Sequence, residues 1–134
     1  MRVELQDQLR TQFPFIETTI DCGDGWYDLI FNLCTEIKAI YDNNSVLNMS
    51  EFKVLEIKEK YGHLCYYTNE NTLPVIIELI TIYEEESRHI CEMCGLLDGK
   101  MSVKNGWYKV LCKICRKKLK HKLVEKKNKN KGSN

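Results

Sequence analysis

Apolar residues recur at helical spacing from the start of the chain. Residues 3–13 place Leu5, Leu9 and Phe13 four positions apart, with polar residues between them. This period brings the three side chains to one face of a helix, and Pro14 cannot continue that helix. The pattern therefore predicts a short amphipathic helix over residues 3–13.

A longer helix is predicted within the stretch DCGDGWYDLIFNLCTEIKAIY. Two glycines mark a turn before it, and Asp24 is positioned to cap its first turn. Spacings of three and four residues predict a helix that ends near residues 42–44. Its buried face would be formed by Trp26, Ile30, Leu33, Ile37 and Ile40.

The next segment changes from helical spacing to alternation. In EFKVLEIKEKYGHLCYYTN, Leu55 and Ile57 alternate with charged residues, and Tyr61-Gly62 forms a turn signal before further strand-forming residues. This arrangement predicts a two-stranded hairpin. A further helix is expected from Thr72, with Pro74 in its first turn, and it would lead directly to the first cysteine pair. Its inner face would hold Ile76, Ile80, Tyr83, Ser87 and Ile90.

Four of the seven cysteines form two pairs with metal-ligand spacing. Cys91 and Cys94 are separated by two residues, as are Cys112 and Cys115, with 17 residues between the pairs. This spacing is typical of a site in which four thiolates hold one Zn²⁺. Four cysteines complete the tetrahedron, so the expected zinc is structural and not catalytic. A redox dithiol is the alternative, but it would leave the second pair without a role.

The residues around these cysteines predict a treble-clef-like zinc finger. Gly95 permits a knuckle turn, Asn105-Gly106 closes a hairpin of residues 101–111, and the second cysteine pair begins a final basic helix. The whole chain is predicted to be α+β, with two amphipathic helices and a β-hairpin following the short first helix. We expect an acidic lobe at residues 1–90, the zinc finger at residues 91–120 and a basic, partly disordered tail at residues 121–134.

Other chemistry-bearing residues have weaker patterns. Cys22, Asp24 and His63 are the members of a conceivable thiol-enzyme site, but nothing in the sequence brings them together. The acids of the GDGWYDLI stretch lack the spacing of a calcium loop. His89 and His121 flank the cysteine pairs and could add a contact to the metal site. Lys109, Lys113 and Arg116 are expected to offset the charge of its thiolates.

Charge is strongly segregated along the chain. Residues 1–99 hold seven Lys/Arg and 18 Asp/Glu, a net charge of −11, whereas residues 100–134 hold 13 Lys/Arg and one acid, a net charge of +12. This asymmetry indicates a charged partner at one end or both. The chain has no signal-peptide pattern and no apolar run of about 20 residues, so we expect a cytoplasmic protein without a membrane partner.

Three stretches carry a resemblance: GDGWYDLIFNLC, EIKEKYGHLCYYTN and CEMCG with GWYKVLCKIC. Together, over residues 21–115, they resemble small zinc-binding proteins encoded by phages and prophages. The resemblance extends to anti-CRISPR proteins that inhibit the type II effector nuclease. It implies a non-enzymatic protein that binds this host defence nuclease and blocks the loading of guide or target nucleic acid. Only the four zinc cysteines carry over to numbered positions.

An alternative function follows from the basic end of the chain. Nine Lys/Arg lie between Arg116 and Lys131, directly after the cysteine pairs. A basic helix in this position would suit a regulator that binds DNA or RNA through its phosphates. Such binding would fall steeply with salt and would need the residues after 115.

Overall fold

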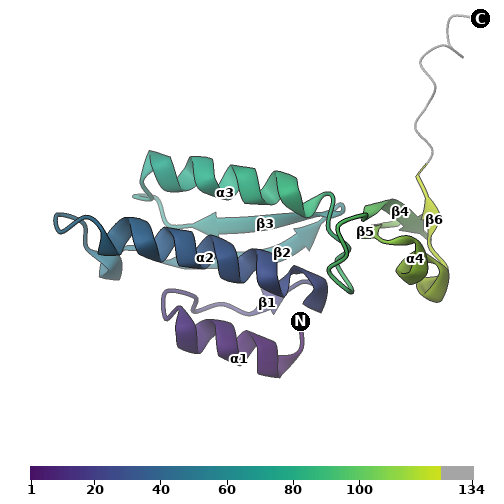
Figure 1. The fold of residues 1–134 in the computed structure, drawn as a ribbon, viewed down its shortest axis with the longest axis horizontal. Helices are drawn as coiled ribbons and strands as arrows, with labels where there is room; N and C mark the ends of the chain where they lie inside the picture. Colours follow the sequence, from purple (N-terminus) through teal and green to yellow (C-terminus); the bar gives the residue numbers. More distant parts are fainter. Residues whose placement is uncertain (125–134) are drawn as a thin grey trace, which may run out of the picture.

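The structure is a computed structural model that describes residues 1–124 (Figure 1). It confirms the mixed α+β class. The elements that precede the cysteine pairs are α1 (Val3–Gln12), β1 (Ile20–Asp21), α2 (Tyr27–Asp42), β2 (Val54–Lys60), β3 (His63–Thr68) and α3 (Pro74–Ser87), with short 3₁₀ turns η1 (Asp24–Trp26) and η2 (Met49–Glu51). The later elements are β4 (Lys100–Lys104), β5 (Trp107–Leu111), α4 (Lys113–Leu119) and β6 (Lys122–Leu123). No helix in the described residues is long and apolar enough to cross a membrane.

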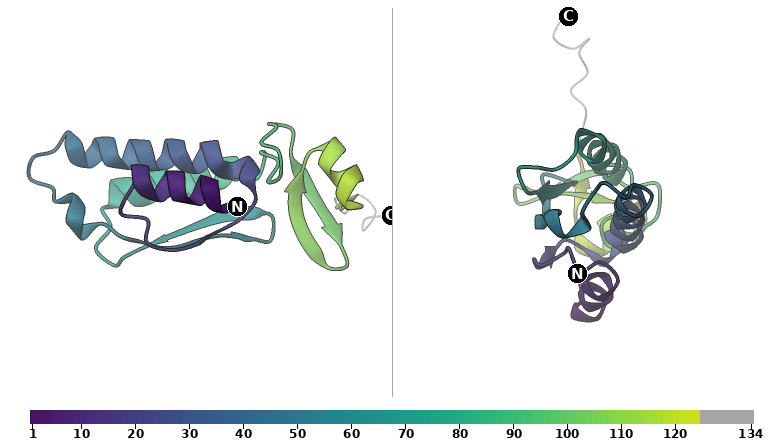
Figure 2. Two further views of the ribbon diagram at one scale, coloured as in Figure 1. Left: turned by 90° about the horizontal axis from the view of Figure 1, so that it is seen from below. Right: turned by 90° about the vertical axis from the view of Figure 1, so that its left-hand side faces the viewer.

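The first sheet has the strand order β1-β2-β3 and is covered by helices on one face. β2 and β3 form the predicted hairpin, and β1 pairs parallel to β2, with Ile20 opposite Ile57. A parallel pair needs a crossover connection, which α2 provides here. α1, α2 and α3 all lie on the same side of the sheet (Figure 2). The sequence did not predict β1, because two residues are too few to show alternation.

One strand residue points the opposite way from its prediction. Leu55 and Ile57 were expected on one face, but Ile57 is fully buried and Leu55 is 59% exposed. The β2–β3 register shifts between Val54 and Glu56, which is the mark of a β-bulge. The extra residue places Val54 in the core and Leu55 in solvent.

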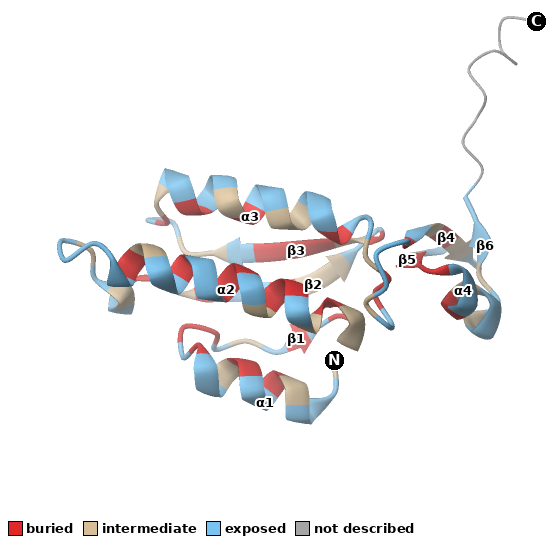
Figure 3. Cartoon of the chain, in the orientation of Figure 1, coloured by how far each residue is buried: buried red, intermediate tan, exposed pale blue. Residues whose placement is uncertain are grey.

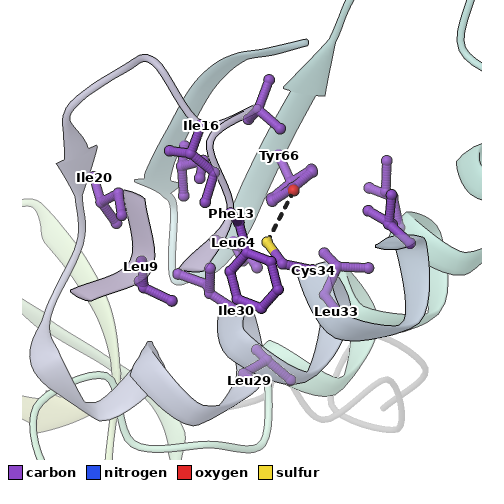
Figure 4. Packing of buried hydrophobic residues seen from close by; sticks show 14 of the residues in the cluster. Leu9, Phe13, Ile16, Ile20, Leu29, Ile30, Leu33, Cys34, Leu64 and Tyr66 are labelled. Atoms are coloured by element: carbon purple, nitrogen blue, oxygen red, sulfur yellow. Dashed lines mark hydrogen bonds between the residues drawn. The ribbon is translucent and has the colours of Figure 1, made fainter. Parts of the chain in front are cut away.

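The hydrophobic core lies between the helices and the sheet. Each covering helix carries buried residues, drawn red in Figure 3, among exposed ones. Leu9, Phe13, Ile30, Leu33 and Leu64 are among the packed residues in Figure 4. The Cys34 thiol lies 3.1 Å from the Tyr66 hydroxyl inside this core, and burial raises the pKa of this thiol to about 12. Cys34 is therefore a packing residue.

Two predicted helix ends need correction. Asp24 does not cap α2; its carboxylate accepts hydrogen bonds from the backbone N–H and the guanidinium of Arg2, at 2.8 and 2.7 Å. The helix begins instead after the turn η1, whose Trp26 is fully buried. α3 ends at Ser87, so three residues separate it from Cys91. Those residues turn the chain out of the helix and toward the second sheet.

The second sheet is small and lies at one end of the first. Its order is β5-β4-β6, and the tight turn at Asn105-Gly106 closes the predicted β4–β5 hairpin. β6 pairs with β4 and was not predicted, since it falls in the segment assigned to the basic tail. The rest of that tail, residues 125–134, lies outside the described residues. The turn between β2 and β3 meets this sheet, because a Cβ at Gly62 would lie 2.6 Å from the Met101 side chain.

Candidate metal centre

The four predicted ligand cysteines come together at one point. The sulfurs of Cys91, Cys94, Cys112 and Cys115 all lie within 4.8 Å of one another, and those of Cys94 and Cys112 are 3.6 Å apart. Sulfurs bound to one Zn²⁺ at about 2.3 Å would lie about 3.8 Å from each other. A disulfide would need about 2.05 Å, and all seven cysteines are free thiols. The cluster therefore has the donor set and spacing of a single metal site.

The two cysteine pairs reach the cluster from different local structures. The first pair lies on a tight turn, residues 91–95, which we call the knuckle. The Gly95 N–H donates to the Cys91 carbonyl at 2.9 Å, and Gly95 has a φ of +84°, which favours glycine. The second pair lies where α4 begins: Cys112 is its N-cap, and Cys115 is in its first turn. A backbone N–H can therefore point directly at a ligand sulfur.

The protein prepares one ligand for metal binding. The Cys115 N–H donates to the Cys112 sulfur at 3.4 Å and, as the largest cause, lowers the pKa of the Cys112 thiol to about 7. Burial raises the pKa of the Cys115 and Cys94 thiols. Because metals bind thiolates, a cation must displace protons from these two sulfurs. The cluster should therefore lose metal as the pH falls.

The knuckle packs against the turn that precedes α2. We call residues 23–25 the GDG loop. The Gly25 N–H donates to the Glu92 carbonyl at 2.7 Å, and the Trp26 indole N–H donates to the Ile90 carbonyl at 3.0 Å. A Cβ at Gly25 would lie 2.2 Å from the Cys91 carbonyl oxygen, and one at Gly23 would lie 2.3 Å from the Glu92 carbonyl oxygen. The glycines of the GDG loop thus allow two backbones to meet beside the metal site.

Glu92 links the metal site to this contact, although no motif in the sequence marks it. Its side chain is buried; it accepts a hydrogen bond from the Gly23 N–H at 2.9 Å and lies 3.3 Å from the Lys109 ammonium. Burial raises the pKa of this carboxyl group, while Lys109 and the Gly23 N–H oppose that shift. The position of this acid between two ligand cysteines was the available signal.

The residues of the conceivable thiol-enzyme site remain apart. Cys22 is buried, and burial raises the pKa of its thiol to about 12, so it is not an activated nucleophile. The His63 ring lies 3.6 Å from the Cys65 sulfur, and Asp24 pairs with Arg2. No hydrogen bond joins Cys22 to either of its supposed partners within residues 1–124.

The other candidates also lie outside the metal cluster. Among the described residues, the four cysteines are the one group of His, Cys, Asp or Glu whose ligand atoms could share an ion, so the acids of the GDGWYDLI stretch form no such group. His121 contacts the Ser102 hydroxyl at 3.2 Å instead, and His89 is not part of the cluster. Two predicted charge partners are engaged elsewhere, since Lys109 pairs with Glu92 and the Arg116 side chain donates to the Leu111 carbonyl.

Comparisons with known proteins find no match: no family model, no curated protein and no solved structure matches this chain.

Proposed function

We propose that the four cysteines hold one structural Zn²⁺ and that the segment around them is a treble-clef zinc finger. The knuckle, the β4–β5 hairpin and α4 follow one another along the chain, and the knuckle and the start of α4 supply the ligands. This order supports the proposal. Four thiolates leave no position for a reacting water, so the zinc would hold the fold and do no chemistry. The buried cluster around the ligands is small, and the metal would supply much of its folding energy.

The protein would act by binding a partner through the acidic face formed by α2 and α3. A groove of about 540 Å³ runs between these helices, and its lining combines apolar and acidic side chains. Val75 and Ile82 are 52% and 55% exposed there, and Glu36 and Glu78 lie in the same lining. An apolar centre with a charged rim is the usual anatomy of a protein-binding surface. This groove is the observation that carries the proposal.

The proposed partner is a basic host defence protein, and the resemblance noted above indicates a type II CRISPR effector nuclease in the bacterial cytoplasm. Such nucleases hold the guide–target duplex in a positively charged channel. An acidic face could occupy this channel and compete with nucleic-acid phosphates. The protein would then be a non-enzymatic, phage-derived inhibitor of nucleic-acid loading.

Co-purification with the nuclease, followed by a DNA-cleavage assay, tests this function. Wild-type protein should form a complex and inhibit cleavage, and the paired substitutions Glu78→Lys and Ile82→Ala should weaken both effects. Val46→Ala, at a residue that is 89% exposed and outside the groove, is the matched control. Absence of both the complex and the inhibition would eliminate the proposal.

A second candidate is a nucleic-acid-binding regulator that uses α4. Residues 100–124 hold nine Lys/Arg and no acid, and Lys113, Lys117 and Lys118 of α4 are exposed. This candidate predicts DNA or RNA affinity that falls steeply with salt and decreases when Lys117 and Lys118 are changed to Gln. The inhibitor function predicts that this double variant still binds its protein partner.

A further inference from the structure

A cleft of about 570 Å³ lies where the β2–β3 turn meets the β4–β5 hairpin. One side is lined by residues 58–61 and the other by residues 105–108. Its volume is within the range of roughly 300–1,000 Å³ that ligand sites occupy. None of its lining residues belongs to the metal cluster or to the α2–α3 groove.

Two aromatic side chains stand exposed in this cleft. Trp107 is 75% exposed and Tyr61 is 68% exposed, whereas Trp26, the other tryptophan of the chain, is fully buried. Large aromatic side chains usually bury most of their surface, so exposed rings that line one hollow suit a ligand with flat faces. Tyr108 adds a third exposed ring to the same lining.

Tyr61 has a positive φ that does not favour a bulky side chain, which indicates that its ring has a role other than forming the turn. Both hairpins close with two residues of positive φ: 48° and 80° at Tyr61-Gly62, and 52° and 80° at Asn105-Gly106. Asn-Gly is the pair that such turns favour, and a bulky residue at the first position is strained. Strained residues of this kind concentrate at binding sites.

Positive charge accompanies the rings. Lys58 and Lys60 line the cleft, and Lys104 is the strand partner of Trp107 at its edge. Lys60 and Lys104 form no ion pair within residues 1–124, while Lys58 pairs with Glu56. The acid of the lining, Glu59, accepts a hydrogen bond from the Gly62 N–H and so is engaged in the turn. With Lys58 paired to Glu56, the remaining charges at the cleft are those of Lys60, Lys104 and Glu59, a net charge of +1.

The same combination continues along the uncovered face of the first sheet. Because side chains alternate along a strand and Lys58 is opposite Cys65, Lys58 and Tyr67 lie on the face away from Ile57 and the helices. The Lys58 ammonium lies 5.8 Å from the centre of the Tyr67 ring. A strand leaving the cleft would therefore meet a further ring, Tyr67, beside Lys58 and its ion-pair partner Glu56.

We propose that this cleft binds single-stranded nucleic acid. Bases stack on Trp107 and Tyr61, and Lys60 and Lys104 contact the phosphates. Interleaved aromatic rings and lysines are the common recognition surface for single strands, because every base has a face that can stack. This site is distinct from α4 and does not depend on the inhibitor function proposed above.

Tryptophan fluorescence of the full-length, zinc-loaded protein tests the site directly. Trp26 is buried and its N–H is bonded to the Ile90 carbonyl, so a stacked base should quench Trp107 selectively. We expect an oligothymidylate to quench the emission in a saturable way at physiological ionic strength. A duplex of the same length should bind more weakly.

Substitutions then separate stacking from general charge attraction. Trp107→Ala should lower affinity for the oligothymidylate by roughly 10- to 100-fold, measured with a labelled strand, whereas Trp107→Phe should keep most of it. Lys60→Gln should reduce the salt slope by about 0.7. Lys100→Gln, at an exposed residue at the other end of β4 from Lys104 and outside the lining of the cleft, is the matched charge control and should leave the affinity nearly unchanged.

Tyr61→Asn distinguishes a binding role from a structural one. It copies the residue at position 105 and relieves the left-handed strain, so the unfolding midpoint should rise by about 2–5 °C while affinity falls. Three results would each overturn the proposal: no binding of the single strand, equal binding by wild type and Trp107→Ala, or equal affinity for duplex and single strand.

Discussion

A methyl group at Gly25 would test whether the metal site is held in place by the GDG loop. The Cβ of Gly25→Ala would lie 2.2 Å from the Cys91 carbonyl oxygen and 2.6 Å from both the Glu92 carbonyl oxygen and the Gly95 nitrogen. Real Cβ contacts are essentially never shorter than 3.0 Å, and all three neighbours are backbone atoms that cannot rotate away. The knuckle would therefore have to move away from the loop.

The expected loss of stability follows from that displacement. Overpacking of a tight contact costs about 1–3 kcal/mol, and the hydrogen bond from the Gly25 N–H to Glu92 contributes about 0.5–1.5 kcal/mol. Replacing glycine by alanine restricts the unfolded chain and returns about 0.4–1 kcal/mol. We therefore expect Gly25→Ala to lower the free energy of unfolding by roughly 2–3 kcal/mol. That is a large part of the 5–15 kcal/mol typical of a protein of this kind.

Urea unfolding of the zinc-loaded protein, followed by circular dichroism, measures this loss. Gly106→Ala is the matched control, because a Cβ there would have no atom within 4 Å and only the positive φ opposes it. The control should cost about 1 kcal/mol. If Gly25→Ala costs no more than Gly106→Ala, the contact between the GDG loop and the knuckle does not hold the metal site.

Three further predictions concern the metal and the buried acid groups. Removing the metal with a chelator should release four thiols to a disulfide reagent and increase hydrogen exchange in residues 91–124, because the buried cluster around the ligands is small. Unchanged exchange would contradict this. Cys22 and Cys34 should stay unreactive at pH 8 until denaturant is added. Folding raises both thiol pKa values from 9.0 to about 12. In a pH series of unfolding curves, their contribution to stability should therefore be complete below pH 9 and decline between pH 9 and 12. Glu92→Ala should lower the free energy of unfolding in urea by about 2–3 kcal/mol, since it removes the acceptor of the Gly23 N–H and the partner of Lys109. Glu92→Gln keeps an acceptor and should cost less than about 1 kcal/mol. Equal losses in the two variants would assign the effect to the ion pair alone.

Local signals in the sequence were sufficient for the helices, the hairpins and the metal ligands. The spacing of apolar residues predicted α2 and its end near residues 42–44, although the start was placed two residues too early, and Tyr61-Gly62 and Asn105-Gly106 located both tight turns. Cysteine spacing identified all four members of the cluster, because both pairs are set by short-range geometry. Each of these features depends on residues that are close together in the chain.

Features that depend on distant residues were missed or misassigned. β1 and β6 have two residues each and exist only because β2 and β4 offer them an edge. Asp24 was assigned to a helix cap because the sequence cannot show that Arg2 reaches it. The GDG loop was attributed to turn geometry alone, yet its glycines are needed by a knuckle almost 70 residues later. Glu92 was missed for the same reason, since only the folded chain shows that it contacts both Gly23 and Lys109.

The α2–α3 groove and the cleft between the β2–β3 turn and the β4–β5 hairpin differ in their dependence on the metal. The α2–α3 groove lies wholly within residues 1–90, whereas the aromatic cleft needs the β4–β5 hairpin to be held against the β2–β3 turn. The metal cluster fixes both ends of the segment that carries this hairpin, so chelation should separate Trp107 from Tyr61 while the groove remains. We therefore expect the chelated protein to lose its affinity for single strands and to retain its protein partner. Loss of partner binding on chelation would show that the partner contacts residues 91–124, and retained binding of single strands would show that the cleft is not their site.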